Sequence, residues 1–353
     1  MTSLPLPHHE HRTSFPNLTM RFPPKLVAGD ELRVLALSRS LGGVMQAGGM
    51  TEQDVEFAKG QLESLGLRVS FGRHVYECNA HLTASPEHRL ADFHEALASH
   101  SVKAILAVTG GVGAIQLLDG LDYPRLATQP KILCGYSDIA YLCNAICARV
   151  GVVTYYGPNF TSFMMRKGAD DTLRSFRECL FGNSPLELQP AAQWSDDAWH
   201  KDQENRTFKT NDGFWPIQPG AAEGTIVGGS YWCLNMLQGS AYFPPLDEAV
   251  LFLEHPGEGK ATLMGLDSGL RALSFQPAFR HVRGIVLGRF PSSGEVTREN
   301  LTALIASIPA LKGLPVVANC DFGHTTPTLT IPIGGRCALQ VEQGRVSIKL
   351  SRY

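Results

Sequence analysis

The stretch KILCGYSDI, residues 131–139, decides the fold of this chain. Its apolar residues 132–134 predict a short buried strand, and Gly135 permits a sharp turn after that strand. Ser137 and Asp138 would then open a helix. A serine on such a strand-to-helix turn is lifted clear of the sheet, where backbone N–H groups can face the oxyanion of a substrate. An ordinary helix N-cap has the same pattern, so both interpretations are open at this point.

The segments around this stretch predict an α/β fold with a parallel sheet. Strands are expected at residues 32–37, 67–71, 104–108 and 152–156. Helical segments separate them, and strand–helix–strand alternation is typical of a parallel sheet. The third of these strands ends in Thr109-Gly110-Gly111, and glycines after a parallel strand allow a ligand to approach the backbone closely. We therefore expect Gly110 and Gly111 at the same edge of the sheet as Ser137.

The length of the chain, 353 residues, exceeds what one hydrophobic core usually holds, so two domains are expected. We predict a loose arm over 1–22, an N-terminal parallel-sheet α/β domain over 23–182, and a strand-rich C-terminal α/β domain over 186–353. The last segment should close with a hairpin over 337–350. Functional residues from both domains would place the active site in the cleft between them.

Composition narrows the classes of function. The formal net charge is −2, which indicates no surface for nucleic acid. We find neither an apolar run long enough to cross a membrane nor a signal-peptide pattern, so a cytoplasmic protein is expected. The eight cysteines are scattered and mostly lie in apolar runs, which is typical of buried thiols. The remaining class of function is chemistry on a small molecule or a peptide.

Three residues form the most economical catalytic set. Ser137 would be the nucleophile, His324 its base, and Glu254 the carboxylate that orients the histidine. Glu254 ends a strongly apolar strand, where a solvated charge at the rim is the alternative. His324 follows an apolar strand in a glycine-containing loop, whereas His255 and His281 occupy positions that favour structural roles.

This scheme needs no metal or other cofactor. The backbone N–H groups of Gly110 and Asp138 would receive the oxyanion. The sequence has no H-E-x-x-H motif, which disfavours a metal-dependent carboxypeptidase. From the residues alone, other combinations of Ser, His and Glu at strand ends remain open.

Three of the four tryptophans lie close together in the segment 193–215. Trp194, Trp199 and Trp215 are interleaved there with acidic residues. Exposed aromatic side chains among polar residues are typical of a loop that stacks on a planar ligand. A hairpin that packs its own tryptophans is the alternative.

Six short motifs follow one another along the chain. They are Thr109-Gly110-Gly111, Gly135-Tyr136-Ser137-Asp138, Gly157-Pro158, Gly228-Gly229, Leu251-Phe252-Leu253-Glu254 and Phe322-Gly323-His324. Together they resemble the LD-carboxypeptidase family of serine peptidases, from roughly position 25 to the end of the chain. The resemblance implies an N-terminal α/β domain that carries the nucleophile Ser137 and a C-terminal domain that carries Glu254 and His324. It also implies Gly110 and Asp138 as the oxyanion donors.

The tryptophan-containing segment resembles one branch of this family, the microcin C immunity peptidases. Members of that branch cleave the amide between an amino acid and a modified adenylate. The resemblance implies that Trp199 stacks on the adenine, and that Trp194, Trp215, Gly111 and Ser230 also bind substrate. Two departures bear on the substrate: Ser230 stands where the family commonly has Asn after two glycines, and Ser38-Arg39 replaces a Ser-Pro type of loop.

We therefore predict a serine carboxypeptidase-like hydrolase that cleaves the amide bond of aminoacyl or peptidyl nucleotide conjugates. It would be a cytoplasmic homodimer that gives resistance to microcin C-type antibiotics, with no nucleic-acid or membrane partner. One alternative is an LD-carboxypeptidase that removes the terminal D-alanine of a murein tetrapeptide in cell-wall recycling. Another is a catalytically silent protein that binds peptides in the same cleft.

Overall fold

The computed structural model describes residues 19–183, 185–257 and 259–353. Its strands are β1 (Glu31–Leu35), β2 (Arg68–Phe71), β3 (Val102–Ala107), β4 (Ile132–Gly135), β5 (Thr154–Tyr156), β6 (Leu186–Glu187), β7 (Gln193–Trp194), β8 (Lys209–Thr210), β9 (Trp215–Gln218), β10 (Gly220–Ser230), β11 (Ala249–Glu254), β12 (Gly284–Gly288), β13 (Val316–Cys320), β14 (Ile331–Ile333), β15 (Arg336–Glu342) and β16 (Arg345–Arg352). Its α-helices are α1 (Leu41–Gln46), α2 (Glu52–Glu63), α3 (Pro86–Ala98), α4 (Tyr123–Thr128), α5 (Ala140–Val150), α6 (Asp170–Phe181), α7 (Tyr231–Met236), α8 (Thr262–Ser274) and α9 (Arg298–Ala306).

The first sheet has the strand order β14-β5-β4-β3-β1-β2. Strands β1 to β5 pair in parallel, as the sequence predicts. β14 comes from the C-terminal part of the chain and pairs antiparallel with β5, with Ile331 opposite Tyr156. β1 lies between β2 and β3, so the carboxyl ends of β1 and β3 flank the point where the strand order reverses.

Local sequence explains where several helices begin and end. Ser85 caps α3, and Pro86 occupies its first turn, where a missing N–H costs nothing. Thr51 and Asp54 form a capping box at the start of α2. Gly151 ends α5 in a left-handed conformation, with φ 64°.

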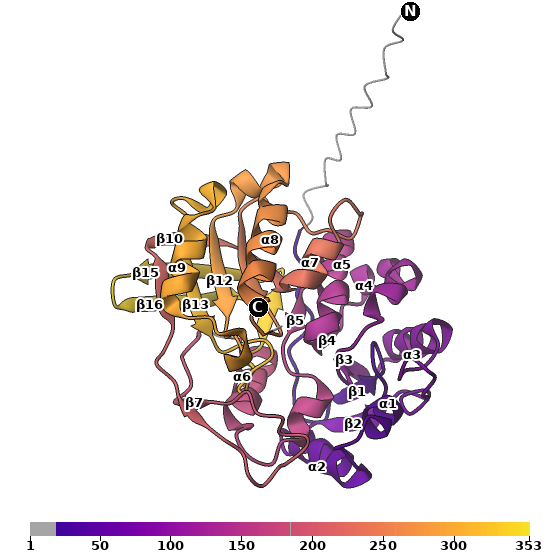
Figure 1. Ribbon diagram of the computed structural model, residues 1–353. Helices are drawn as coiled ribbons and strands as arrows, with labels where there is room; N and C mark the ends of the chain where they lie inside the picture. Colours follow the sequence, from indigo (N-terminus) through magenta and orange to yellow (C-terminus); the bar gives the residue numbers. More distant parts are fainter. Residues whose placement is uncertain (1–18, 184, 258) are drawn as a thin grey trace, which may run out of the picture.

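The second sheet has the order β6-β16-β15-β10-β11-β12-β13-β9. Its centre, β10 to β13, is parallel, and its remaining strands pair antiparallel. β15 and β16 form the predicted closing hairpin around Gln343-Gly344. Figure 1 shows this part, in orange and yellow with α8 and α9, beside the indigo and magenta first sheet. The predicted α/β fold with a strand-rich C-terminal part is confirmed.

The hydrophobic core joins the two sheets. The larger cluster of buried side chains contains Leu35 and Ile132 from the first sheet together with Phe252 and Leu339 from the second. A smaller cluster lies between the second sheet and helices α8 and α9. The predicted domain division at 182–186 falls between α6 and β6.

The first 18 residues of the predicted arm lie outside the described residues. Arg21 pairs with Val152 beside the first sheet, and Phe22 packs against the core, so the end of the predicted arm belongs to the folded part. All eight cysteines are free, and all but Cys78 are buried. Within the described ranges, no helix has both the length and the apolar composition needed to cross a membrane.

Candidate active site

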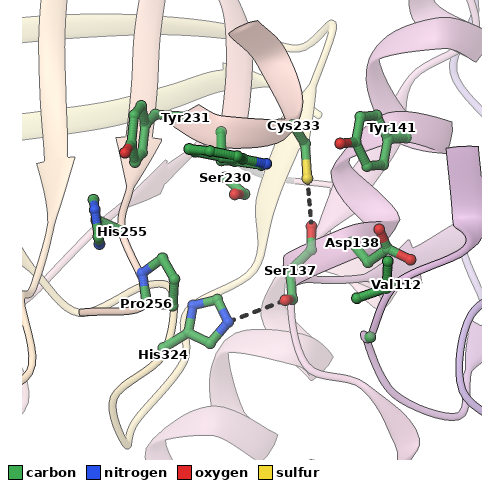
Figure 2. Close-up of a pocket in the computed structure, with 12 residues that line it drawn as sticks. Val112, Ser137, Asp138, Tyr141, Ser230, Tyr231, Cys233, His255, Pro256 and His324 are labelled. Carbon is green, nitrogen blue, oxygen red and sulfur yellow. Dashed lines mark hydrogen bonds between the residues drawn. The ribbon is translucent and has the colours of Figure 1, made fainter. Parts of the chain in front are cut away.

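Ser137 lies on the turn between β4 and α5. Its φ is 64°, a left-handed conformation that non-glycine residues rarely adopt and that is found at functional sites. A single 3₁₀ turn over Ser137–Ile139 separates it from α5, whose N-cap is Ile139. The interpretation of Ser137 as an ordinary helix N-cap is therefore wrong. Figure 2 shows its hydroxyl directed into a pocket, toward the ring of His324.

The structure brings the three predicted catalytic residues into one hydrogen-bonded chain. Ser137 Oγ lies 3.1 Å from His324 Nε2, and His324 Nδ1 lies 2.7 Å from Glu254 Oε2. The Glu254 side chain is fully buried at the end of β11, so it is not a solvated rim charge. Burial by itself would lower the pKa of His324, but the adjacent Glu254 carboxylate raises that pKa above its ordinary value.

A fourth residue, Tyr156, links this chain to the backbone of Ser137. Its hydroxyl donates to Glu254 Oε1 at 2.7 Å and accepts the N–H of Ser137 at 2.9 Å. Burial raises the pKa of Tyr156 well above 10, so the hydroxyl stays protonated and able to donate. Sequence reasoning missed this residue. The one available signal was that its strand, β5, is predicted to end at the same sheet edge as Ser137.

Gly110 lies directly against Ser137. A Cβ at this position would come within 2.6 Å of Ser137 Cβ and 2.9 Å of Ser137 Oγ, so a larger residue cannot be placed here without displacing the serine. The same Cβ would lie 3.4 Å from the backbone nitrogen of Asp138. Both predicted oxyanion donors therefore lie beside Ser137.

The side chain of Asp138 holds the glycine loop that follows β3. Its carboxylate accepts hydrogen bonds from the Ser38 hydroxyl at 2.5 Å and from the N–H groups of Gly113 and Ala114 at 2.9 and 2.7 Å. Burial raises the pKa of Asp138, although these bonds favour its charged form. Asp138 thus fixes the loop that contains Gly110.

A pocket of about 250 Å³ opens over Ser137, with walls from both halves of the chain (Figure 2). The predicted binding residues Gly111 and Ser230 line it. Trp232 and His255 also line it and were not predicted. The ring of His255 stacks on Tyr231 with centroids 4.9 Å apart. The position of His255, directly after Glu254, was the signal available in the sequence.

The tryptophans predicted to bind substrate lie elsewhere. The guanidinium of Arg289 lies over the ring of Trp194, with its Cζ 4.7 Å from the centre of that ring. Trp199 packs against the hydrophobic core, and Trp215 donates its indole N–H to a neighbouring carboxylate. The lining of this pocket includes none of the three; it includes Trp232, which is 56 % exposed. Contact of Trp194, Trp199 or Trp215 with substrate stays a prediction.

Among the residues that the structure describes, one group of side chains could hold a metal ion, and it lies outside this pocket. The group is His74, Glu77 and His88, whose ligand atoms lie within 4.8 Å of one another. Each histidine already has a carboxylate partner: His74 Nδ1 lies 2.8 Å from Asp92, and His88 Nδ1 lies 2.6 Å from Glu77. None of these residues lines the pocket over Ser137.

The two-domain α/β fold and its Ser–His–Glu arrangement place this protein among the serine peptidases. Residues 40–157 match the family model of the LD-carboxypeptidase N-terminal domain, and residues 223–339 match that of the C-terminal domain. The chain belongs to the LD-carboxypeptidase family, which confirms the resemblance noted in its sequence.

Similar proteins cover most of the chain. A putative carboxypeptidase of Bacillus subtilis, YocD, is 41% identical over 329 residues, which cover 93% of this chain and 99% of that protein. A murein tetrapeptide carboxypeptidase of Pseudomonas aeruginosa is 36% identical, over 79% of this chain and 86% of that protein. The crystal structure of an MccF-like protein from Bacillus anthracis has a TM-score of 0.91 and 42% identity, and covers 94% of this chain and 100% of that chain.

Proposed function

We propose that this protein hydrolyses the amide bond of aminoacyl or peptidyl nucleotide conjugates, with Ser137 as the nucleophile. The observation that supports a hydrolase of this type is the continuous hydrogen-bonded chain from Ser137 through His324 to Glu254. Such a chain is the arrangement that activates a serine for attack on a carbonyl carbon.

The chemistry follows from the positions of these groups. As Ser137 Oγ attacks the amide carbon, His324 Nε2 accepts the hydroxyl proton, and Glu254 holds Nδ1–H and stabilises the imidazolium. His324 then gives the proton to the leaving nitrogen, and the C–N bond breaks. Water attacks the acyl-enzyme, with His324 again as the base, and releases the acid and free Ser137.

The oxyanion would be stabilised by the N–H groups of Gly110 and Asp138. The N–H of Ser137 itself is occupied by the hydroxyl of Tyr156, so it is not available for this role. Fixed donors cost no reorganisation during the reaction, and Asp138 fixes the loop that supplies one of them.

The nucleotide part of the proposal is supported by the exposed aromatic side chain of Trp232 at the pocket and by the likeness to an MccF-like protein. An exposed indole offers a face on which a purine can stack. Such an enzyme would inactivate a microcin C-type antibiotic in the cytoplasm, and we expect it to be a homodimer.

A second candidate is removal of the terminal D-alanine from a murein tetrapeptide. It is favoured by the positions of Trp194, Trp199 and Trp215, which do not line the pocket, and by the identity to a murein tetrapeptide carboxypeptidase. This reaction would use the same three catalytic residues.

The deciding experiment compares kcat/KM for an aminoacyl sulfamoyl adenosine and for a murein tetrapeptide. We expect the nucleotide conjugate to be cleaved more efficiently, and a preference for the tetrapeptide would support the second candidate. Ser137→Ala is the control in both assays. If this variant turns substrate over like the parent, the serine mechanism is wrong and a silent binding protein with a contaminating activity is the better explanation.

A further inference from the structure

A second pocket, of about 280 Å³, adjoins the pocket over Ser137. Val112 lines both, and its side chain is 90 % exposed between them. The second pocket is lined by Arg39, Arg89, His81, Asn79 and Gln116, among others. No Asp or Glu occurs among the described residues of its lining, so its chemistry is that of cations and neutral hydrogen-bonding groups.

This pocket lies where ligands bind in open α/β sheets. Arg39 follows β1, while Val112 and Gln116 follow β3, and these two neighbouring parallel strands flank the reversal of strand order. Ligands of open α/β sheets bind in the crevice outside the carboxyl ends of the strands at such a point. The proposed reaction uses Ser137 at the end of β4 and leaves Arg39 without a role.

The two arginines of this pocket differ in their hydrogen-bond partners within the protein. Arg89 is buried and donates to the carbonyl oxygens of Leu37 and Gly113 and to the side-chain oxygen of Gln116. Arg39 is half-buried, and its guanidinium has no hydrogen bond or ion pair to any of the residues that the structure describes. A guanidinium in this state can give its donors to an anionic ligand in a bidentate, charge-assisted contact.

Arg39 lies close to the nucleophile through the glycine loop. A Cβ on Gly111 would be 3.3 Å from Arg39 Cβ, and a Cβ on Gly110 would be 2.6 Å from Ser137 Cβ. These side chains therefore flank two consecutive glycines. Ser38, which precedes Arg39, also donates its hydroxyl to Asp138, which follows Ser137. An anion held by Arg39 would lie near the bond that Ser137 attacks.

We propose that Arg39 binds the anionic group of the leaving amine. This inference rests on the proposed function and adds the residue that recognises that side of the substrate. Both candidate substrates carry an oxyanion beside the scissile nitrogen: the carboxylate of a terminal amino acid, or the phosphorus oxyanion of a nucleotide phosphoramidate. The described lining of the pocket over Ser137 contains no Lys or Arg that would bind this charge.

The test uses substrate pairs that differ only in this charge. One pair is a murein tetrapeptide with a free terminal carboxylate and the same peptide as its terminal amide. The other is an aminoacyl phosphoramidate of adenosine and its neutral methyl ester. We expect the parent enzyme to prefer the charged member of the pair it cleaves by about 10- to 100-fold in kcat/KM, as a charge-assisted contact provides. Arg39→Ala should lose this preference and keep the rate on the neutral member.

Matched variants separate binding from folding. Arg39→Gln keeps the side-chain stem, Arg39→Lys keeps the charge and should retain part of the preference, and Arg73→Ala removes an exposed arginine that lines neither pocket. If the parent cleaves neither pair, the proposed function is wrong. If it cleaves one pair without a charge preference, or if Arg39→Ala and Arg39→Gln keep that preference, Arg39 does not bind the leaving group while the proposed function stands.

Discussion

The two adjoining pockets differ in whether their charged groups have partners, and the difference lies in Arg39, because the other arginine of the second pocket, Arg89, is hydrogen-bonded. Around Ser137, the hydroxyl, imidazole and carboxylate form one hydrogen-bonded chain, and the Tyr156 hydroxyl pairs with the carboxylate and with the backbone N–H of Ser137. In the neighbouring pocket, the Arg39 guanidinium has no partner among the described residues. Pairing fixes the geometry of reacting groups before substrate arrives, whereas an unpaired cation keeps its donors for the ligand. On our proposals, the groups that react are held in place by hydrogen bonds, and the guanidinium that recognises the ligand keeps its donors free.

The largest expected effect concerns whether the paired groups act as one unit. Ser137→Ala and His324→Ala should each lower kcat by about 10⁴-fold or more, and the double variant should be no slower than either single one. Residues that act together are not additive, because the loss of one removes the use of the other. Single-turnover kinetics of the three variants would measure this, and multiplying effects in the double variant would show that the residues work independently.

Glu254→Gln should lower kcat by about 10³- to 10⁴-fold, since the amide no longer stabilises the imidazolium. The same change should move the acid limb of the pH profile of kcat/KM. Glu254 raises the pKa of His324, and the protonated ring cannot accept the Ser137 proton, so activity in the parent rises with pH through a pKa above 6.5. Without the carboxylate, that limb should shift to lower pH, and an unmoved limb would contradict the role of Glu254.

Tyr156→Phe should lower kcat about tenfold, because Glu254 and the N–H of Ser137 each lose a hydrogen-bond partner. The unfolding free energy should fall by about 1–3 kcal/mol, since the exchange leaves buried polar groups unsatisfied. Tyr155→Phe is the matched control: Tyr155 is equally buried, and its hydroxyl has no hydrogen-bond partner among the described residues. Equal effects of the two variants on rate and stability would show that the hydrogen bonds of the Tyr156 hydroxyl do not support the hydrogen-bonded chain.

The smallest expected effect concerns Trp232, the exposed aromatic residue in the lining of the pocket over Ser137. Trp232→Ala should raise KM for an aminoacyl sulfamoyl adenosine about 3- to 10-fold with little change in kcat, because a stacking contact is lost in both ground and transition states. Trp199→Ala tests the prediction made from the sequence, which expects the same pattern. Unchanged kinetics in Trp199→Ala would show that this tryptophan serves packing.

Much of the site could be predicted because it depends on local sequence and strand ends. The turn that carries Ser137 is specified locally, by the strand, the glycine and the helix within a few residues of it. Glu254 ends one apolar parallel strand and His324 follows another, and the carboxyl ends of these strands share one edge of the second sheet. The predicted strand bounds are close to those observed, for example 32–37 against Glu31–Leu35.

The rest could not be predicted because it depends on contacts between distant segments. Tyr156 reads as an ordinary buried aromatic residue, and its role appears only when β5 is placed against β4 and β11. Composition suggested a stacking loop around Trp194, but its ring lies against Arg289, far along the chain. The exposed position of Trp232 beside Ser137 depends on how the second sheet meets the first.

The pairing of β14 with β5 has a consequence for the order of synthesis. The segment that carries His324 is fixed by β13 in one sheet and by β14 in the other. A nascent chain that ends near residue 182 would already contain Ser137, but the edge of β5 would have unpaired N–H and C=O groups, which are prone to aggregation. The last strand of the first sheet and His324 therefore emerge from the ribosome almost together, so the hydrogen-bonded chain that begins at Ser137 can be completed only when the strand that covers the edge of β5 is also at hand.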